Sequence, residues 1–169
     1  MNRCNTKENT IELINKLRKK VKNIQIRTTF ILGFPTETEE DFEELCDFVK
    51  TYKLNQVGFF AYSREKGTIA YDLKPQIPEK IKKQRVKILA QLQYENVKEN
   101  NLNLIGQEFD AIVDNVNEDY YIFRTDFQLP NLDNITIVYS SNLTIGEYYR
   151  VRIVGSFGYD LVAEIVKSI

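Results

Sequence analysis

The residues that could take part in chemistry concentrate between Arg27 and Phe42, in the stretch RTTFILGFPTETEEDF. Glu37 lies between a predicted strand and a predicted helix. It is either a group that contacts a ligand or part of the acidic start of the helix, and the second interpretation is favoured. Arg27 lies in a predicted buried strand, where a charge must be paired or line a cavity. Because ligands bind at loops after the carboxyl ends of parallel strands, this stretch is the candidate site. The alternative, left open by these residues alone, is that any strand–helix turn needs a glycine and a cap.

The sequence lacks the standard catalytic motifs. It has no histidine, no glycine spacing typical of a Rossmann or phosphate-binding loop, and no serine elbow. Its two cysteines, Cys4 and Cys46, are too far apart for a zinc knuckle or a redox pair. Cys46 shares an apolar helix face with Phe42 and Val49, so we expect it in the core. We expect no metal site in this chain.

Helices and strands are predicted to alternate around the candidate site. Thr6 and Thr38 are expected to cap two helices, and both strands consist of apolar and β-branched residues. The second strand shows no polar alternation, so we expect both of its faces to be covered. This order of elements predicts parallel βα repeats. The predicted segments are the helices Thr6–Lys20 and Thr38–Tyr52 and the strands Ile24–Leu32 and Gln56–Ser63.

A long helix is predicted from about Glu79 to Asn100, after an irregular segment that follows Ser63. Pro78 suits its first turn. The helix carries apolar residues at Ile81, Ile88, Leu89 and Leu92 and a run of lysines. We interpret this run as a solvated face, with a binding patch as the less favoured alternative; the lysines are Lys80, Lys82, Lys83 and Lys87.

The pattern changes near residue 104, where short strands separated by turn-forming clusters replace the longer segments. Such spacing predicts a small closed β-barrel. We therefore expect an α/β domain over residues 1–103 and an all-β domain over residues 104–169. The predicted strands are Glu108–Val113, Tyr120–Arg124, Ile135–Tyr139, Tyr148–Val154 and Leu161–Val166.

The two halves carry opposite charge. Residues 1–103 hold 19 Lys and Arg against 14 Asp and Glu, whereas residues 104–169 hold 4 against 10. The halves therefore have net charges of +5 and −6 and are expected to have different partners. No apolar run approaches the length of a membrane span, and no signal-peptide stretch follows Met1. We expect a cytoplasmic protein without a membrane partner.

Taken together, these motifs resemble the radical-SAM methylthiotransferases over essentially the whole chain. The stretch from Arg27 to Phe42 is similar to their fifth-strand region, and VGFFAYSREKGT from Val57 to Thr68 is similar to their sixth strand and the loop after it. The residues of the second motif are more similar to the branch that modifies the twelfth protein of the small ribosomal subunit (RimO type) than to the transfer-RNA branch (MiaB type). From Ile105 onwards the chain resembles the family's TRAM barrel, on the residues Tyr120, Tyr121, Arg124, Thr125, Pro130, Asp133, Gly146, Glu147, Tyr148, Tyr159, Asp160 and Leu161.

The resemblance implies the last βα units of an open radical-SAM (TIM-like) barrel, followed by a five-stranded, OB-like TRAM barrel. It implies an enzyme that uses S-adenosylmethionine and [4Fe–4S] clusters to methylthiolate the β-carbon of an aspartate in that ribosomal protein. The cofactor-binding residues would be Gly33, Phe34, Pro35, Thr36 and Glu37 in the loop, with Arg27, Thr29 and Tyr62 facing the barrel interior. The partner-binding residues would be Arg124, Asp126, Asp133 and Asp160.

The chain departs from the family pattern in ways that bear on activity. The three-cysteine motif that holds the catalytic cluster lies upstream of anything present, so we expect the chain alone to be inactive and to depend on the missing amino-terminal cluster domains. Thr36 stands where glycine is usual. Two alternatives are the transfer-RNA branch (MiaB type) and a non-enzymatic TRAM adaptor. The acidic barrel argues for a basic ribosomal protein as partner and makes transfer RNA the weaker expectation.

Overall fold

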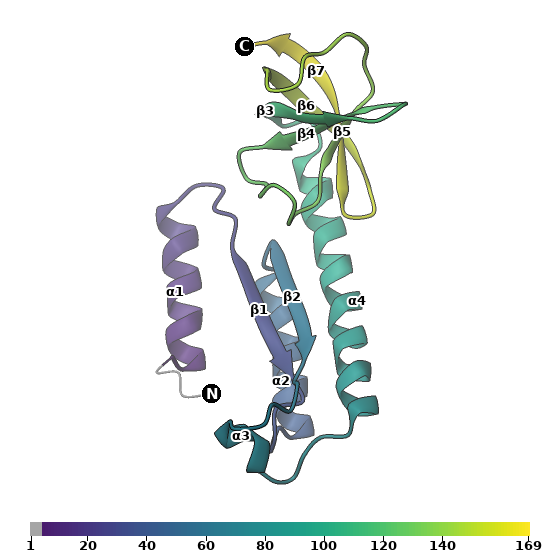
Figure 1. Ribbon diagram of the computed structural model, residues 1–169. Helices are drawn as coiled ribbons and strands as arrows, with labels where there is room; N and C mark the ends of the chain where they lie inside the picture. The colour runs from purple at the N-terminus through teal and green to yellow at the C-terminus, as the bar shows by residue number, and fades with distance from the viewer. Residues whose placement is uncertain (1–4) are drawn as a thin grey trace. The chain divides into compact units, whose positions relative to one another are not determined.

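A computed structural model describes residues 5–169 of the chain (Figure 1). The chain divides into two compact units, one ending at Gln93 and the other beginning at Tyr94. The helix α4 (Glu79–Leu104) contributes residues to both units. The domain boundary between residues 103 and 104 stays a prediction.

The first two helices begin where the sequence predicts. α1 (Lys7–Lys20) follows Thr6, whose side chain accepts a hydrogen bond from the Asn9 backbone N–H at 3.2 Å. α2 (Glu39–Tyr52) follows Thr38, which forms a reciprocal capping box with Asp41. Each hydroxyl satisfies a backbone N–H that has no partner inside the helix. Both predicted caps are confirmed.

The strands β1 (Arg27–Leu32) and β2 (Gln56–Ala61) pair in parallel, as predicted, with Leu32 opposite Ala61. One face of this pair packs against α2, which passes behind the strands in Figure 1, and against α4. The core of the first unit lies between these elements. Its buried residues are Leu32, Phe42, Cys46, Val49 and Leu89.

The other face of the two strands is exposed, which corrects the prediction that both faces are covered. Burial alternates along β1, and the large side chains Ile31 and Phe60 are 41% and 62% exposed. Arg27 lies on the same exposed face, so the expectation of a charge within a buried strand is wrong. The reason is that side chains alternate between the faces of a strand, and α2 and α4 pack on one face only.

The buried face of α4 also differs from the prediction. Lys82 and Arg85 are buried, whereas Ile81 and Ile88 are each 40% exposed. The interpretation of the lysine run as a solvated face is therefore wrong for Lys82, because its ammonium finds the Tyr62 carbonyl oxygen after β2 and the Glu79 carboxylate on its own helix. The helix also extends to Leu104, and a short helix that the sequence did not predict, α3 (Ile69–Asp72), precedes it.

The second unit contains the predicted barrel. Five strands close in the order β3-β4-β5-β7-β6, with β5 and β7 parallel and the other pairs antiparallel. Inward-facing residues such as Phe123, Val151 and Leu161 are fully buried. The strands are β3 (Glu108–Val116), β4 (Tyr121–Thr125), β5 (Thr136–Val138), β6 (Tyr148–Phe157) and β7 (Asp160–Ser168).

The helices of this structure are amphipathic or mostly polar. α4 has 26 residues, which is long enough for a membrane span, but it carries many charges. Among residues 5–169, no helix combines the length and the apolar composition needed to cross a membrane.

The capping box at Thr38 gives a direct test of the α2 boundary. We expect Thr38→Ala to lower the free energy of unfolding by about 1 kcal/mol, because the Asp41 N–H loses its acceptor. Thr51→Ala makes the same chemical change at an exposed position near the end of α2 and is the control. Urea unfolding followed by circular dichroism measures both. Equal losses in the two variants would contradict the role of the cap.

Candidate functional site

The loop after β1 turns at Gly33, and this position requires glycine for two reasons. Its φ is +72°, a conformation that residues with a Cβ rarely adopt. A Cβ added there would also lie 2.1 Å from Cγ of Lys82 on α4. The lysine stem therefore packs directly on the turn.

Glu37 fixes the same loop from the other side. Its Oε2 accepts a hydrogen bond from the Gly33 N–H at 2.8 Å, and its Oε1 forms an ion pair with Arg85. Arg85 also pairs with Glu39 at 2.7 Å. Burial alone would lower the pKa of Arg85, but the hydrogen bonds to Glu39 and Glu37 raise it above its ordinary value. Both carboxylate oxygens of Glu37 thus have partners within the protein.

Lys82 joins the loop to the end of β2. Its Nζ donates to the Tyr62 carbonyl oxygen at 2.7 Å and pairs with Glu79, also at 2.7 Å. The Tyr62 N–H in turn donates to the carbonyl oxygen of Leu32, the last residue of β1, at 2.8 Å. The carboxyl ends of both parallel strands are therefore fastened to each other and to α4.

Thr36 adopts an unfavourable backbone conformation in this loop. Its φ is +77°, in the left-handed region that β-branched residues avoid. Its N–H donates to the Pro75 carbonyl oxygen at 3.2 Å, and its side chain is exposed. This geometry gives the physical reason that glycine would suit the position.

An apolar pocket of about 750 Å³ opens beside the ends of the strands. Phe34 and Tyr62 line it, with their rings in a T-shaped contact at 5.3 Å between centroids. The Tyr62 hydroxyl is buried and finds no hydrogen-bond partner among the described residues. The other lining residues are Ile31, Phe60, Ala61, Ser63, Glu65, Thr68, Ile69, Ala70 and Leu73.

The remaining predicted cofactor residues do not line this pocket. Arg27 and Thr29 are on the exposed face of β1, and Thr36 is exposed in the loop. Gly33 and Pro35 are buried, and Glu37 faces Arg85. The structure thus brings Phe34 and Tyr62 together at one cavity and gives Gly33 and Glu37 places in the frame of the loop.

The described residues offer no metal site. Residues 5–169 contain no cluster of three or more histidine, cysteine, aspartate or glutamate side chains placed to bind an ion. Cys46 is buried in the core, as predicted, and burial raises the pKa of its thiol, which disfavours the thiolate that a metal requires. Cys4 lies outside the described residues.

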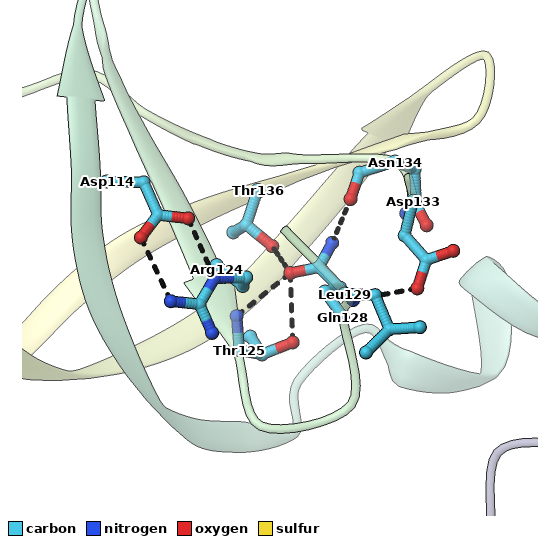
Figure 2. Close-up of polar contacts among 8 residues, drawn as sticks. All are labelled: Asp114, Arg124, Thr125, Gln128, Leu129, Asp133, Asn134 and Thr136. Atoms are coloured by element: carbon cyan, nitrogen blue, oxygen red, sulfur yellow. Dashed lines mark hydrogen bonds and ion pairs between the residues drawn. The ribbon is translucent and has the colours of Figure 1, made fainter. Parts of the chain in front are cut away.

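The barrel contains a buried polar centre at Gln128 (Figure 2). Its Oε1 accepts hydrogen bonds from the Thr125 N–H and from the hydroxyls of Thr125 and Thr136, at 2.9 to 3.0 Å. Its Nε2 donates to the Asn134 carbonyl oxygen at 2.8 Å. One side chain therefore fixes the segment that links β4 to β5.

Three of the four predicted partner-binding residues have partners inside the barrel. Arg124 forms two hydrogen bonds with Asp114, at 2.8 and 3.2 Å, and these bonds raise its pKa (Figure 2). Asp133 accepts from the Leu129 N–H at 2.8 Å, and Asp160 accepts from the Ile135 N–H at 2.9 Å. Asp126 is exposed. Their role in binding a partner stays a prediction.

Arginines on the barrel surface are matched by carboxylates. Arg150 pairs with Asp110 at 3.0 Å, and Arg152 pairs with both Glu108 and Glu164. With Arg124, three of the four basic residues in 104–169 are engaged in ion pairs. Little positive charge remains for a phosphate backbone.

The second unit belongs to the class of small closed β-barrels with five strands. Residues 105–166 match the family described as the TRAM domain.

The whole chain is similar to proteins named ribosomal protein uS12 methylthiotransferase RimO. The identity is 38% over 99% of this chain for the protein of Chlamydia felis, 44% over 96% for that of Clostridium perfringens, and 43% over 98% for that of Phocaeicola vulgatus. The chain spans 38%, 36% and 39% of their respective lengths, which is under two-fifths of the curated relatives it matches. The chain thus corresponds in sequence to the carboxyl-terminal portion of RimO-type methylthiotransferases, which confirms the resemblance drawn from its motifs.

Sequence reasoning missed the residues that hold both sites together. Lys82 and Arg85 are two cations spaced three apart on α4, and like charges at this spacing give no signal of a buried ion pair. Gln128 precedes the predicted turn Pro130–Asn134, and a polar residue next to a turn is expected to be exposed, so the sequence gives no signal that Gln128 is buried. The distant partners of Lys82 and Arg85, the Tyr62 carbonyl oxygen and Glu37, come from other segments, so local sequence does not reveal them. The partners of Gln128 lie within eight residues of it in the chain.

Removing the Arg85 charge should leave the partly buried Glu37 carboxylate without its cation. We expect Arg85→Met to lower the free energy of unfolding of the first unit by about 3 kcal/mol. Lys87→Met removes an exposed cation from the same helix and should change the free energy by less than about 0.5 kcal/mol. Urea unfolding of both variants checks this. Equal losses in Arg85→Met and Lys87→Met would contradict a stabilising role of the ion pair.

Removing the Gln128 amide should leave buried polar groups of the barrel without hydrogen-bond partners. We expect Gln128→Leu to lower the free energy of unfolding by about 2 kcal/mol, since the Thr125 N–H and the Asn134 carbonyl lose their partners. Gln107→Leu makes the same change at an exposed position and serves as the control. Amide hydrogen exchange of residue 125 gives a local readout, and protection that survives in Gln128→Leu would contradict the role of the amide.

Proposed function

We propose that this chain serves in a radical-SAM methylthiotransferase that modifies ribosomal protein uS12, as the portion that completes the cofactor pocket and recruits the substrate protein. The observation that carries this proposal is the similarity to proteins of that name across both units of the chain. The TRAM match covers the second unit alone. Agreement over the first unit as well is what favours the enzyme over a non-enzymatic adaptor.

The first unit would supply two strands of an open parallel barrel. Parallel strands are normally covered on both faces, whereas β1 and β2 leave Ile31 and Phe60 exposed. In this proposal, the exposed face turns towards the barrel interior, and Arg27 and Thr29 face inward with it. The remaining strands would come from the part of the relatives that this chain does not span.

The apolar pocket suits S-adenosylmethionine. Its walls match an adenosyl group in character, and the buried Tyr62 hydroxyl offers a polar contact that no described residue uses. Phe34 and Tyr62 would contact the ligand directly. Gly33, Pro35, Thr36 and Glu37 would shape the loop around it, with the Glu37 carboxylate held by Arg85.

The residues of this chain do not suit an iron–sulfur cluster. A [4Fe–4S] cluster is held by cysteine thiolates in clustered spacing, and the sequence contains Cys4 and Cys46 only. In the proposed enzyme, the cluster and bound S-adenosylmethionine would supply the radical chemistry that adds sulfur and a methyl group at an aspartate β-carbon. The thiolates would lie outside this sequence, so the chain alone would be inactive.

The acidic barrel would recruit the basic ribosomal protein in the cytoplasm, where ribosomes are assembled. Residues 104–169 carry a net charge of −6, and the ion pairs of Arg124, Arg150 and Arg152 reduce their availability to phosphates. Opposite charge on a partner steers its approach. The same charge disfavours transfer RNA, because neutralised phosphates supply most of the affinity for nucleic acid.

A titration of the full chain over a salt series tests the partner. We expect binding to purified uS12 that weakens as salt rises and no measurable binding to transfer RNA, since the barrel repels the phosphate backbone. Fluorescence anisotropy with labelled uS12 or labelled transfer RNA provides the measurement. Tight binding to transfer RNA that falls by orders of magnitude between about 50 and 200 mM salt would instead favour the transfer-RNA branch.

A further inference from the structure

A second pocket, of about 390 Å³, lies on the barrel beside β3 and β4 and against the loop of residues 129–135. It is separate from the apolar pocket of the first unit and belongs wholly to the TRAM domain. Its charged lining residues are Asp114, Arg124 and Asp133, shown in Figure 2, and its apolar walls include Ile122, Leu129 and Ile135.

The strand geometry places Asp114 at this pocket. The register of β3 against β4 shifts between Val113 and Asn115, so Asp114 is the extra residue of a β-bulge. A bulge redirects a side chain out of the regular alternation of the strand. Asp114 consequently meets the side chain of Arg124 with two hydrogen bonds at the pocket wall.

The opposite wall is held in place before any ligand arrives. Gln128 ties the loop to Thr125 and Thr136, and Asp133 accepts the Leu129 N–H. These contacts bind both ends of the loop within the barrel (Figure 2). Because a preformed wall needs no ordering on binding, the loop is a suitable side of a recognition pocket.

The charge of the pocket favours a cation. The lining holds two carboxylates and one guanidinium, and the Nε and Nη2 of that guanidinium already donate to Asp114. An anion would approach both carboxylates, and the domain around them has a net charge of −6. The apolar walls suit the methylene stem of a lysine, whose ammonium can then reach the carboxylate oxygens of the lining.

We propose that this pocket receives a lysine side chain of the basic protein that binds the TRAM domain. The identity of that protein rests on the proposed function, whereas the pocket and its preference for lysine rest on the residues described above. The pocket gives the acidic surface a defined point of attachment, so that binding fixes the register of the partner as well as its approach.

Two aspartates of β3 form a matched pair for the test. Asp114 and Asp110 each pair with an arginine on a neighbouring strand, but Asp114 alone lines the pocket. Asp114→Asn and Asp110→Asn therefore change net charge equally. The probe is acetyl-tetralysine-amide, titrated into the 15N-labelled full chain. We expect amide shifts centred on residues 114–115, 122–124 and 129–135, and a dissociation constant raised about fivefold in Asp114→Asn and less than twofold in Asp110→Asn.

A second pair leaves the Asp114–Arg124 contact in place. Asn115→Lys adds a cation at the pocket lining, and Ser141→Lys adds the same charge at an exposed loop outside it. We expect about fivefold weaker probe binding in Asn115→Lys and less than twofold in Ser141→Lys. Dispersed amide spectra confirm that each variant is folded.

The lysine pocket would be contradicted if the two variants of each pair changed the dissociation constant of the probe equally. It would also be contradicted if the amide shifts were spread evenly over the acidic surface, because both results indicate general charge attraction. The same variants titrated with uS12 separate the two proposals. Binding of uS12 that weakens equally in Asp114→Asn and Asp110→Asn overturns the pocket and leaves the partner in place. Tetralysine binding at the pocket without uS12 binding supports the pocket and overturns the partner.

Discussion

The contact between α4 and the ends of the two parallel strands is the interaction on which the first unit depends. Lys82 packs its stem on Gly33 and donates to the Tyr62 carbonyl, while Arg85 holds the Glu37 carboxylate. Two buried cations are costly unless each finds a partner, and each does so at a strand end. The same contacts that stabilise the fold therefore set the shape of the loop beside the apolar pocket.

The two faces of the parallel strands β1 and β2 differ in burial. α2 and α4 cover one of their faces, and the other presents Ile31 and Phe60 together with the pocket lined by Phe34 and Tyr62. An apolar face of this kind is typical of a site that another structural element or a ligand completes. In the proposed function, the part of the longer methylthiotransferases that this chain does not span would cover that face.

The barrel keeps an ordered structure although residues 104–169 carry a net charge of −6. Its arginines pair with carboxylates on adjacent strands, and Gln128 satisfies the buried groups of the loop between β4 and β5. Closure of the five strands leaves no long unpaired edge. The excess carboxylates then remain on the surface, where they can attract a basic partner.

The sequence by itself determined the long helices and the strands, their order and the resemblance to the family, but it did not predict the short helix α3. Caps such as Thr6 and Thr38, the β-branched strands and the spacing of turns are local signals, so the parallel pair and the closed barrel were predictable. The convergence of Phe34 and Tyr62 followed from the topology, since both come after parallel strands. Only the tertiary structure decided which faces are buried: it exposed Arg27 and buried Lys82, because burial depends on neighbours distant in the sequence.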